Sequence, residues 1–154
     1  MSAGGVQPIE RGTRPAPSGV VMSGVLELAA GALSGWVYAA VKYDDGGARK
    51  LRIKSPGRIR QWHLDLIALG TGTVVMGLAV PDAPKPVQRA LVAGAWANAM
   101  MFLPLAYWPE ALQNRAYRKL GLASFTSTSV GFAGMALTAL RRRAAHRPPA
   151  TDRG

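Results

Sequence analysis

The sequence contains no cysteine, and only two of its 154 residues are histidine. Without cysteine the chain forms no disulfide, no cysteine-ligated iron–sulfur cluster and no thiol nucleophile. One histidine, His146, lies in a basic C-terminal segment, so an imidazole ligand for a metal or haem has to be His63. The sequence also lacks Gly-x-x-x-x-Gly-Lys, His-Glu-x-x-His and Gly-x-Ser-x-Gly motifs. These absences exclude P-loop kinases, zinc proteases and serine hydrolases.

Acidic residues are scarce as well. Asp and Glu number 8 against 19 Lys and Arg, which leaves a formal net charge of +11. Nearly all of these charges lie outside four apolar segments, at about 19–41, 62–80, 90–108 and 119–140. A helix of about 20 apolar residues crosses the hydrocarbon core of a bilayer. The sequence therefore predicts an all-α integral membrane protein, a four-helix transmembrane bundle that is multi-pass in the cell membrane.

The segments outside the four spans are basic and rich in turn-forming residues. Residues 1–18 and 141–154 are predicted to be disordered tails, and residues 42–60 a basic loop. A partly alternating stretch at 49–54 predicts a short hairpin within that loop. Basic loops beside a span attract anionic lipid headgroups, and no groove-binding motif or stacking platform points to nucleic acid. The expected partners are therefore membrane lipids and not nucleic acid.

Small residues are frequent in the spans, and Gly31 and Gly35 form a Gly-x-x-x-Gly pair in the first of them. Such faces let helices approach closely where lipid provides no hydrophobic drive for association. The contact that they make can lie within one subunit or between subunits. Because four short helices form only a small bundle, we expect a homo-oligomer.

Few polar side chains lie inside the spans, and each requires an explanation. Glu27, deep in the first span, is either a neutral residue hydrogen-bonded to another helix or a functional carboxyl. Asn98, in the middle of the third span, either joins two helices or lines a site. His63, at the start of the second, is either an interfacial hydrogen-bonding residue or a ligand. Pro104 leaves the carbonyl of Met100 without its helical donor and predicts a kink there.

Short pieces of the second and third spans match a known pattern. The second span contains His63-Leu64-Asp65, with Gly70 seven residues after the histidine and Pro81 at its end. The third contains Trp96-Ala97-Asn98. With these pieces and its four-span plan, the chain resembles the small membrane isomerases that include styrene oxide isomerase and hydroxylaminobenzene mutase.

The resemblance implies a haem enzyme. In the styrene oxide isomerase type, the histidine of the second span ligates a haem b held between the subunits of a trimer. The ferric iron acts there as a Lewis acid on an epoxide oxygen, and an aldehyde is formed. By resemblance, His63 would be the axial ligand, and Trp96 and Asn98 would line the site of a small apolar substrate. Gly70, on the same helix face as His63, would leave space for a flat cofactor.

Two positions depart from the family pattern. The family has Asn six residues after the histidine, and styrene oxide isomerases have Tyr six residues after the tryptophan. This chain has Leu69 and Phe102 at these two positions. The polar groups expected next to the substrate oxygen are therefore missing. The chain either acts on a different substrate or has lost the isomerase reaction.

Two other classes of function stay open. A non-catalytic membrane subunit or scaffold would associate through the small-residue face of Gly31 and Gly35. A small proton-coupled transporter would use Glu27 as its proton carrier. Haem binding separates the isomerase hypothesis from the other two, because only the isomerase hypothesis predicts a coloured protein.

Overall fold

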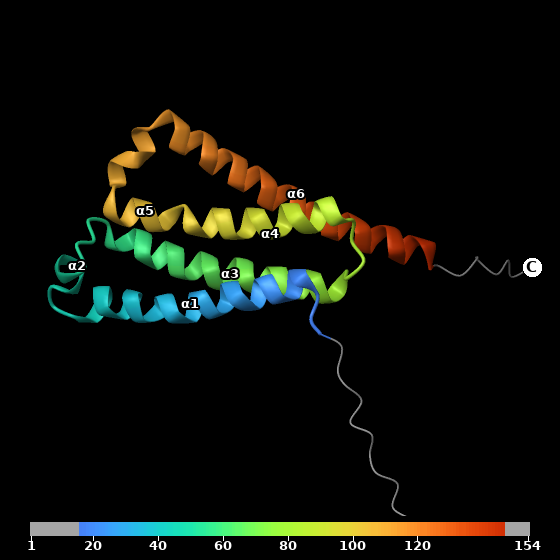
Figure 1. Cartoon of the computed structure of the whole chain (residues 1–154), viewed down its shortest axis with the longest axis horizontal. Coiled ribbons are helices and arrows are strands. Elements are labelled where there is room, and N and C mark those ends of the chain that lie inside the picture. Colours follow the sequence, from blue (N-terminus) through green and yellow to red (C-terminus); the bar gives the residue numbers. More distant parts are fainter. Residues whose placement is uncertain (1–15, 147–154) are drawn as a thin grey trace, which may run out of the picture.

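The structure, a computed structural model, describes residues 16–146, and that part of the chain contains helices and no strand. The elements are, in chain order, α1 Gly19–Tyr43, α2 Gly47–Lys50, α3 Pro56–Ala79, α4 Lys85–Met100, α5 Phe102–Tyr107, the 3-10 helix η1 Pro109–Gln113 and α6 Arg115–Ala145. Figure 1 shows the long helices α1, α3, α4 with α5, and α6 running in alternating directions. The prediction of an all-α four-helix bundle is confirmed.

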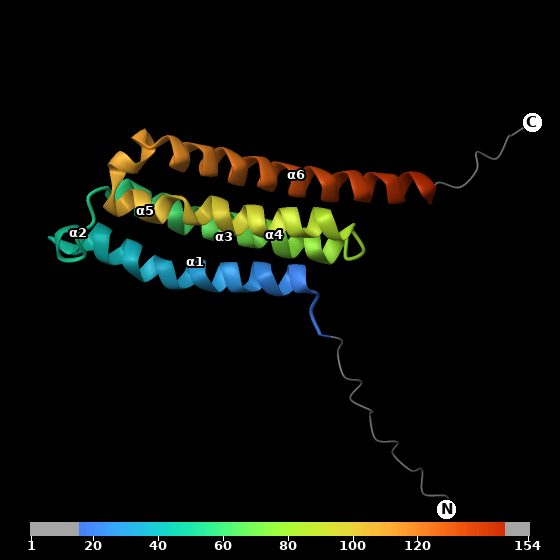
Figure 2. The ribbon, with the colours of Figure 1, turned by 45° about the horizontal axis from the view of Figure 1, so that its top comes forward.

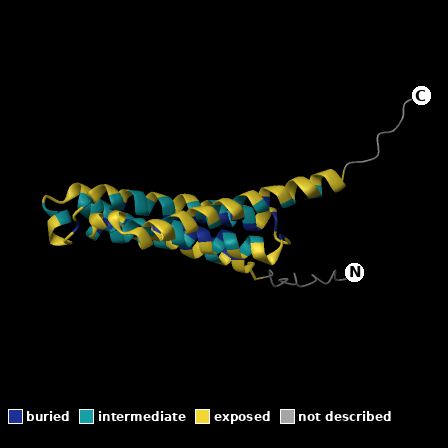
Figure 3. Cartoon of the chain, turned by 90° about the horizontal axis from the view of Figure 1, so that it is seen from above, coloured by how far each residue is buried: buried dark blue, intermediate teal, exposed yellow. Residues whose placement is uncertain are grey.

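Four helical segments are long and apolar enough to cross a membrane: α1, α3, the segment Lys85–Tyr107 and α6. Between 22% and 33% of the residues in their most apolar stretches are buried inside the bundle. Figure 3 shows exposed and half-buried residues along the whole bundle. Large apolar side chains such as Leu33 and Leu122 are about 70% exposed, a surface suited to lipid rather than to water. The chain is therefore a multi-pass integral membrane protein, as its composition predicts.

Glycines set the distance between the long helices. A Cβ atom on Gly24 of α1 would lie 2.8 Å from the main-chain oxygen of Gly70 on α3, so these helices meet backbone to backbone. Gly131 of α6 packs in the same way on the main chain of Leu91 in α4. Figure 2 shows α1 and α6 on opposite sides of the central pair α3 and α4. The bundle thus consists of the close pairs α1–α3 and α4–α6, joined through α3 and α4.

The ends of three helices differ from the predicted ranges by five residues or more, and one of them is α4, which begins at Lys85 rather than at 90. Helix α3 begins at Pro56 rather than at 62, and α6 continues to Ala145 instead of giving way to a tail at 141. An apolar pattern marks the part of a helix that lies in hydrocarbon, whereas its hydrogen-bond ladder continues into the headgroup region. Cations in the last turn, such as Arg142, also stabilise the C-terminus of α6. The rest of the predicted tails, residues 1–15 and 147–154, lies outside the described residues.

The predicted hairpin at 49–54 is wrong. Gly46, at a φ of 93°, allows the chain to begin the short helix α2 instead. The N–H groups of Lys54 and Ser55 then donate to the carbonyl of Ala106 in α5, at 2.9 and 3.0 Å. The side chain of Ile53 is buried beneath this loop. The basic loop therefore packs against α5 at one end of the bundle. Residues 49–54 have no neighbouring strand in residues 16–146 with which to form a hairpin.

The hydrogen-bond pattern of the third span is interrupted near Pro104, but Met101 keeps helical dihedral angles (φ −61°, ψ −25°), so the kink itself stays a prediction. The helix is interrupted at Met101, between α4 and α5, three residues before Pro104. The hydroxyl of Tyr117 on α6 donates to the carbonyl of Met101 at this break. An otherwise free carbonyl inside the bundle thus finds a donor on a neighbouring helix, which is the usual way such breaks are tolerated in membrane proteins.

Candidate functional site

The imidazole of His63 is held against α1. Its Nδ1 atom lies 2.9 Å from the main-chain oxygen of Gly31 and 3.1 Å from Oγ of Ser34. A carbonyl oxygen only accepts hydrogen bonds, so Nδ1 carries the proton and donates it. In the neutral ring, Nε2 is then the nitrogen with a free lone pair.

Two further residues of α1 fix the plane of this imidazole. The ring of Tyr38 stacks on it with a centroid distance of 5.7 Å and an interplanar angle of 16°. Gly35 leaves room for it, because a Cβ atom there would lie 3.2 Å from Cε1 of His63. The small-residue face of Gly31 and Gly35 is therefore occupied by α3 of the same subunit. This face is not free to form the contact between subunits that the scaffold hypothesis requires.

The donor chemistry of His63 fits a haem iron. A histidine that ligates a metal usually donates its other ring N–H to a carbonyl or a carboxylate, which fixes the tautomer and the ring orientation. His63 has this arrangement at Nδ1, whose hydrogen bond to Gly31 leaves the lone pair of the neutral ring on Nε2. The described part of the chain holds no group of three or more potential ligands for a metal ion. A single axial histidine to haem requires no such group.

Gly70 does not provide space for a cofactor within the subunit. A Cβ atom on Gly70 would lie 2.9 Å from the main-chain nitrogen of Leu28 and 3.1 Å from the carbonyl oxygen of Gly24. Helix α1 therefore fills the space that the missing side chain leaves. Gly70 therefore has a close neighbour, as the sequence indicates, but that neighbour is helix α1 and not a cofactor.

Asn98 lies between two cavities on the other side of α3. One cavity, of about 290 Å³, is lined by Asn98 and Phe102 together with residues of α6. The other, of about 310 Å³, is lined by Asn98 and Leu69, again with residues of α6. The structure thus brings Asn98, Leu69 and Phe102 into one region. His63 is not among the residues that line either cavity.

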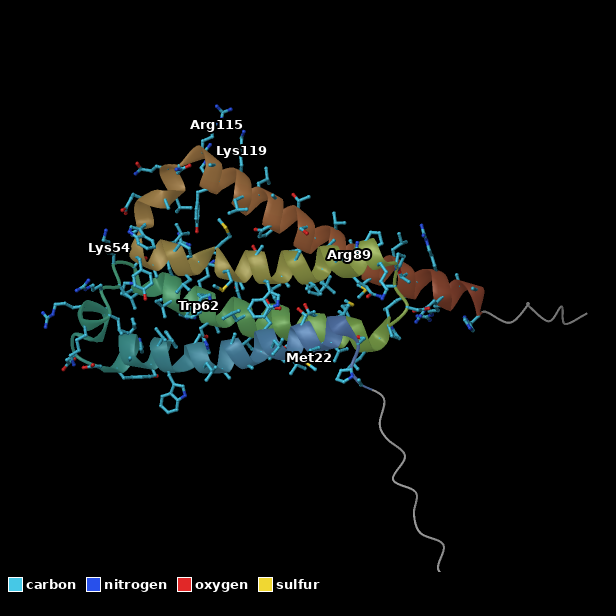
Figure 4. The ribbon with its side chains drawn as sticks, viewed as in Figure 1. Met22, Lys54, Trp62, Arg89, Arg115 and Lys119 are labelled. Carbon is cyan, nitrogen blue, oxygen red and sulfur yellow. The ribbon has the colours of Figure 1, made fainter. Side chains whose placement is uncertain are left out.

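Trp96 points to a different helix from Asn98. Its indole Nε1–H donates to Oγ of Ser23 on α1 at 3.0 Å. Ser23 precedes Gly31 by eight residues, about 12 Å along a helix, so Trp96 is not beside His63 either. Trp62, which Figure 4 shows between α3 and α4, donates to Sδ of Met100 at 3.4 Å. The predicted site residues therefore fall into three places.

Glu27 is completely buried, and both of its carboxyl oxygens lack a hydrogen-bond partner within residues 16–146. The same holds for Oγ1 of Thr73 on α3. Gly24 and Gly31, which flank Glu27 on the same face of α1, pack on α3. Glu27 and Thr73 thus lie in the same contact between α1 and α3. The interhelical hydrogen bond that was one of the two predictions for Glu27 is not formed to a described residue.

Sequence reasoning missed Ser34, Tyr38 and Arg58. Ser34 and Tyr38 follow Gly31 by three and seven residues and so share its helix face, a spacing that could have identified them. Arg58 gives no such signal, since it lies in the predicted loop, yet its guanidinium carbon is 5.9 Å from the centre of the Phe102 ring.

Comparison of this chain with protein-family models, curated proteins and solved structures finds no match. The resemblance to the membrane isomerases therefore rests on the short residue patterns of spans two and three.

Proposed function

We propose that this chain is a haem-dependent membrane isomerase that rearranges a small apolar molecule, with His63 as the axial ligand of the iron. The observation that carries the proposal is the contact between Nδ1 of His63 and the carbonyl of Gly31, 2.9 Å long. This contact leaves Nε2 for the metal and holds the ring in one orientation. Bound haem would supply a Lewis acid for an oxygen of the substrate.

The remaining groups of the proposed site are mostly apolar. Asn98 has an amide that both donates and accepts hydrogen bonds, but it lines cavities that His63 does not line, so a role for Asn98 beside the iron would require a second subunit to complete the site. Leu69 and Phe102 add apolar surface to these cavities, where the resemblance to styrene oxide isomerases would place polar groups. The proposal is therefore a rearrangement of a substrate other than styrene oxide. A homo-oligomer, with a trimer as the first state to test, is part of the proposal because of the resemblance to the styrene oxide isomerases.

The test is haem binding by the full chain expressed with excess haem and purified in detergent. We expect a Soret band at one haem per subunit in the wild-type protein and its loss in His63→Ala. His146→Ala is the matched control, since His146 is the other histidine and its Nδ1 also lies 2.8 Å from a carbonyl, that of Arg142. A His63→Gly variant should recover the band when imidazole is added.

Two outcomes would contradict haem binding by His63. One is a colourless wild-type protein, and the other is a His63→Ala variant with a full Soret band. Circular dichroism of each variant shows whether the helices are intact. The rearrangement is tested separately by following aldehyde formation from a panel of epoxides, with Asn98→Leu expected to lower the rate while the Soret band is retained.

The complete burial of Glu27, without a hydrogen-bond partner among residues 16–146, favours proton-coupled transport as the second candidate function. The matched variant is Glu27→Gln, which keeps the size of the side chain and removes its ionisation. In proteoliposomes with an internal pH dye, this function predicts a proton flux in the wild-type protein that Glu27→Gln abolishes. An equal flux in both proteins would exclude Glu27 as the carrier.

A further inference from the structure

The cavity of about 290 Å³ beside Asn98 results from a divergence of two helices. Along its C-terminal half α6 packs tightly on α4, where Gly131 meets Leu91 and Gly134 meets Val87. Figure 1 shows that its N-terminal half moves away from α5. The short helix η1 connects α5 to α6 at this end of the bundle. An internal space open to one side is left between α4, α5 and α6.

The cavity extends along α6 from its first turn toward the middle of the helix. At one end it is lined by Tyr117 and Arg118, in the first turn of α6. Toward the other end it is lined by Ser124 and Phe125. Seven residues of helix separate Arg118 from Phe125, a distance of about 10 Å along the axis. The lining is largely apolar and includes Phe102, Leu105 and Leu122. It thus matches a molecule with a polar head and an apolar body.

Positive charge lies at the end of the cavity next to the first turn of α6. Arg118 is part of the lining, and the guanidinium of Arg58 lies over the ring of Phe102, another lining residue. Arg58 uses one nitrogen to bond Oε1 of Gln61, at 2.8 Å. Within residues 16–146 the ion pairs join Lys50 to Asp44, Lys54 to Glu110 and Arg142 to Asp82, so neither arginine is paired with a carboxylate there. Two guanidinium groups without a carboxylate partner favour an anionic head.

We propose that this cavity binds a single-chain amphiphile with a carboxylate head, a molecule of the fatty-acid class, taken up from the bilayer. Arg118 and Arg58 would receive the carboxylate, and Phe102, Leu122 and Phe125 would contact the chain. Ligand pockets range from about 300 to 1,000 Å³, and this cavity is at the small end of that range. It suits one chain and not the two chains of a phospholipid. The proposal does not require haem, because His63 does not line this cavity, although the cavity shares Asn98 and Phe102 with the proposed substrate site.

The test uses the full chain in nanodiscs of phosphatidylcholine at pH 8, with a dansyl-labelled undecanoic acid as the fluorescent probe. Dodecanoic acid and dodecan-1-ol compete for the site as a matched pair that differs only in the head. We expect dodecanoate to displace the probe about tenfold more strongly than the alcohol, the effect of one charged hydrogen bond. Arg118→Gln should remove this difference. Lys119→Gln is the control, because Figure 4 shows Lys119 pointing away from the bundle.

A second pair of variants tests the location. A Cβ atom on Gly121 would lie 3.4 Å from Cε of Met101, an ordinary contact, so Gly121→Ala should fold and bind the probe. Gly121→Phe fills the cavity and should abolish binding, with an unchanged circular dichroism spectrum. Probe binding that survives Gly121→Phe would overturn the proposal.

Three further results would contradict the proposed fatty-acid site. Equal displacement by the acid and the alcohol would overturn the assignment of a carboxylate head. Equal loss of affinity in Arg118→Gln and Lys119→Gln would mean that the surface charge as a whole, and not the cavity, attracts the probe. Displacement by added phosphatidylglycerol as strong as that by dodecanoate would identify a bilayer lipid as the occupant and overturn the assignment to fatty acids.

Discussion

Nδ1 of His63, on α3, lies 2.9 Å from the main-chain oxygen of Gly31, on α1, and this contact joins the two helices that pack together most extensively in the bundle. Oγ of Ser34 lies 2.6 Å from the same oxygen and 3.1 Å from Nδ1, so the three polar groups form a small closed network. The network helps to pack α1 on α3. It also leaves Nε2 as the ring nitrogen whose lone pair could bind a metal. Both roles follow from a single tautomer.

That tautomer is the first prediction. In protein labelled with ¹⁵N-histidine, the neutral His63 ring should carry its proton on Nδ1 and not on Nε2, because the carbonyl of Gly31 can only accept. The Ser34→Ala variant should keep this tautomer, since the bond to Gly31 remains. A ring protonated at Nε2 would mean that Nδ1 is not a donor to Gly31, and it would remove the structural support for ligation through Nε2.

Gly24→Ala should destabilise the bundle. The added methyl group would lie 2.8 Å from the carbonyl oxygen and from a main-chain nitrogen of α3, at Gly70 and Val74, and neither can move independently of its helix. Overpacking of this kind costs about 1–3 kcal/mol in the free energy of unfolding. Gly57→Ala is the control, because nothing lies within 4 Å of a Cβ atom there. Thermal unfolding in detergent should show a lower Tm for Gly24→Ala alone.

Thr73→Val should stabilise the protein. Its hydroxyl is buried without a hydrogen-bond partner among the described residues, and valine has the same shape without the desolvated oxygen. Removal of an unsatisfied buried polar group gains about 1–3 kcal/mol. The control is Thr71→Val, whose exposed hydroxyl donates to the carbonyl of Ile67 at 2.7 Å, and for which we expect a change within about 0.5 kcal/mol.

The opposite result for Thr73→Val would also be informative. A lower Tm would show that the hydroxyl has a partner in the membrane. Glu27, buried in the same contact between α1 and α3, is the polar group to examine next. The double variant with Glu27→Gln measures this coupling, because the effects of two residues that interact do not add.

Local properties of the sequence predict most of this fold. The length and apolarity of the four segments determine that four helices cross the membrane, and these properties do not depend on which helix packs against which. The break at Met101 is equally local, since Pro104 cannot donate to the carbonyl of Met100 wherever the segment lies. The glycines likewise predict close approach between helices. Loop 49–54 was predicted wrongly because its conformation depends on α5, to which it is hydrogen-bonded.

The neighbours of each polar side chain were decided by tertiary structure alone. Periodicity places His63 and Gly70 on one face of a helix, but it does not say that α1 covers that face and fills the space at Gly70. Nor does it say that Asn98 faces the cavities beside α6 whereas Trp96 bonds to α1. The rotation and pairing of helices depend on the packing of all four together. The sequence by itself thus determined a four-span membrane protein with one candidate haem ligand, and packing decided what that ligand and the other polar groups can reach.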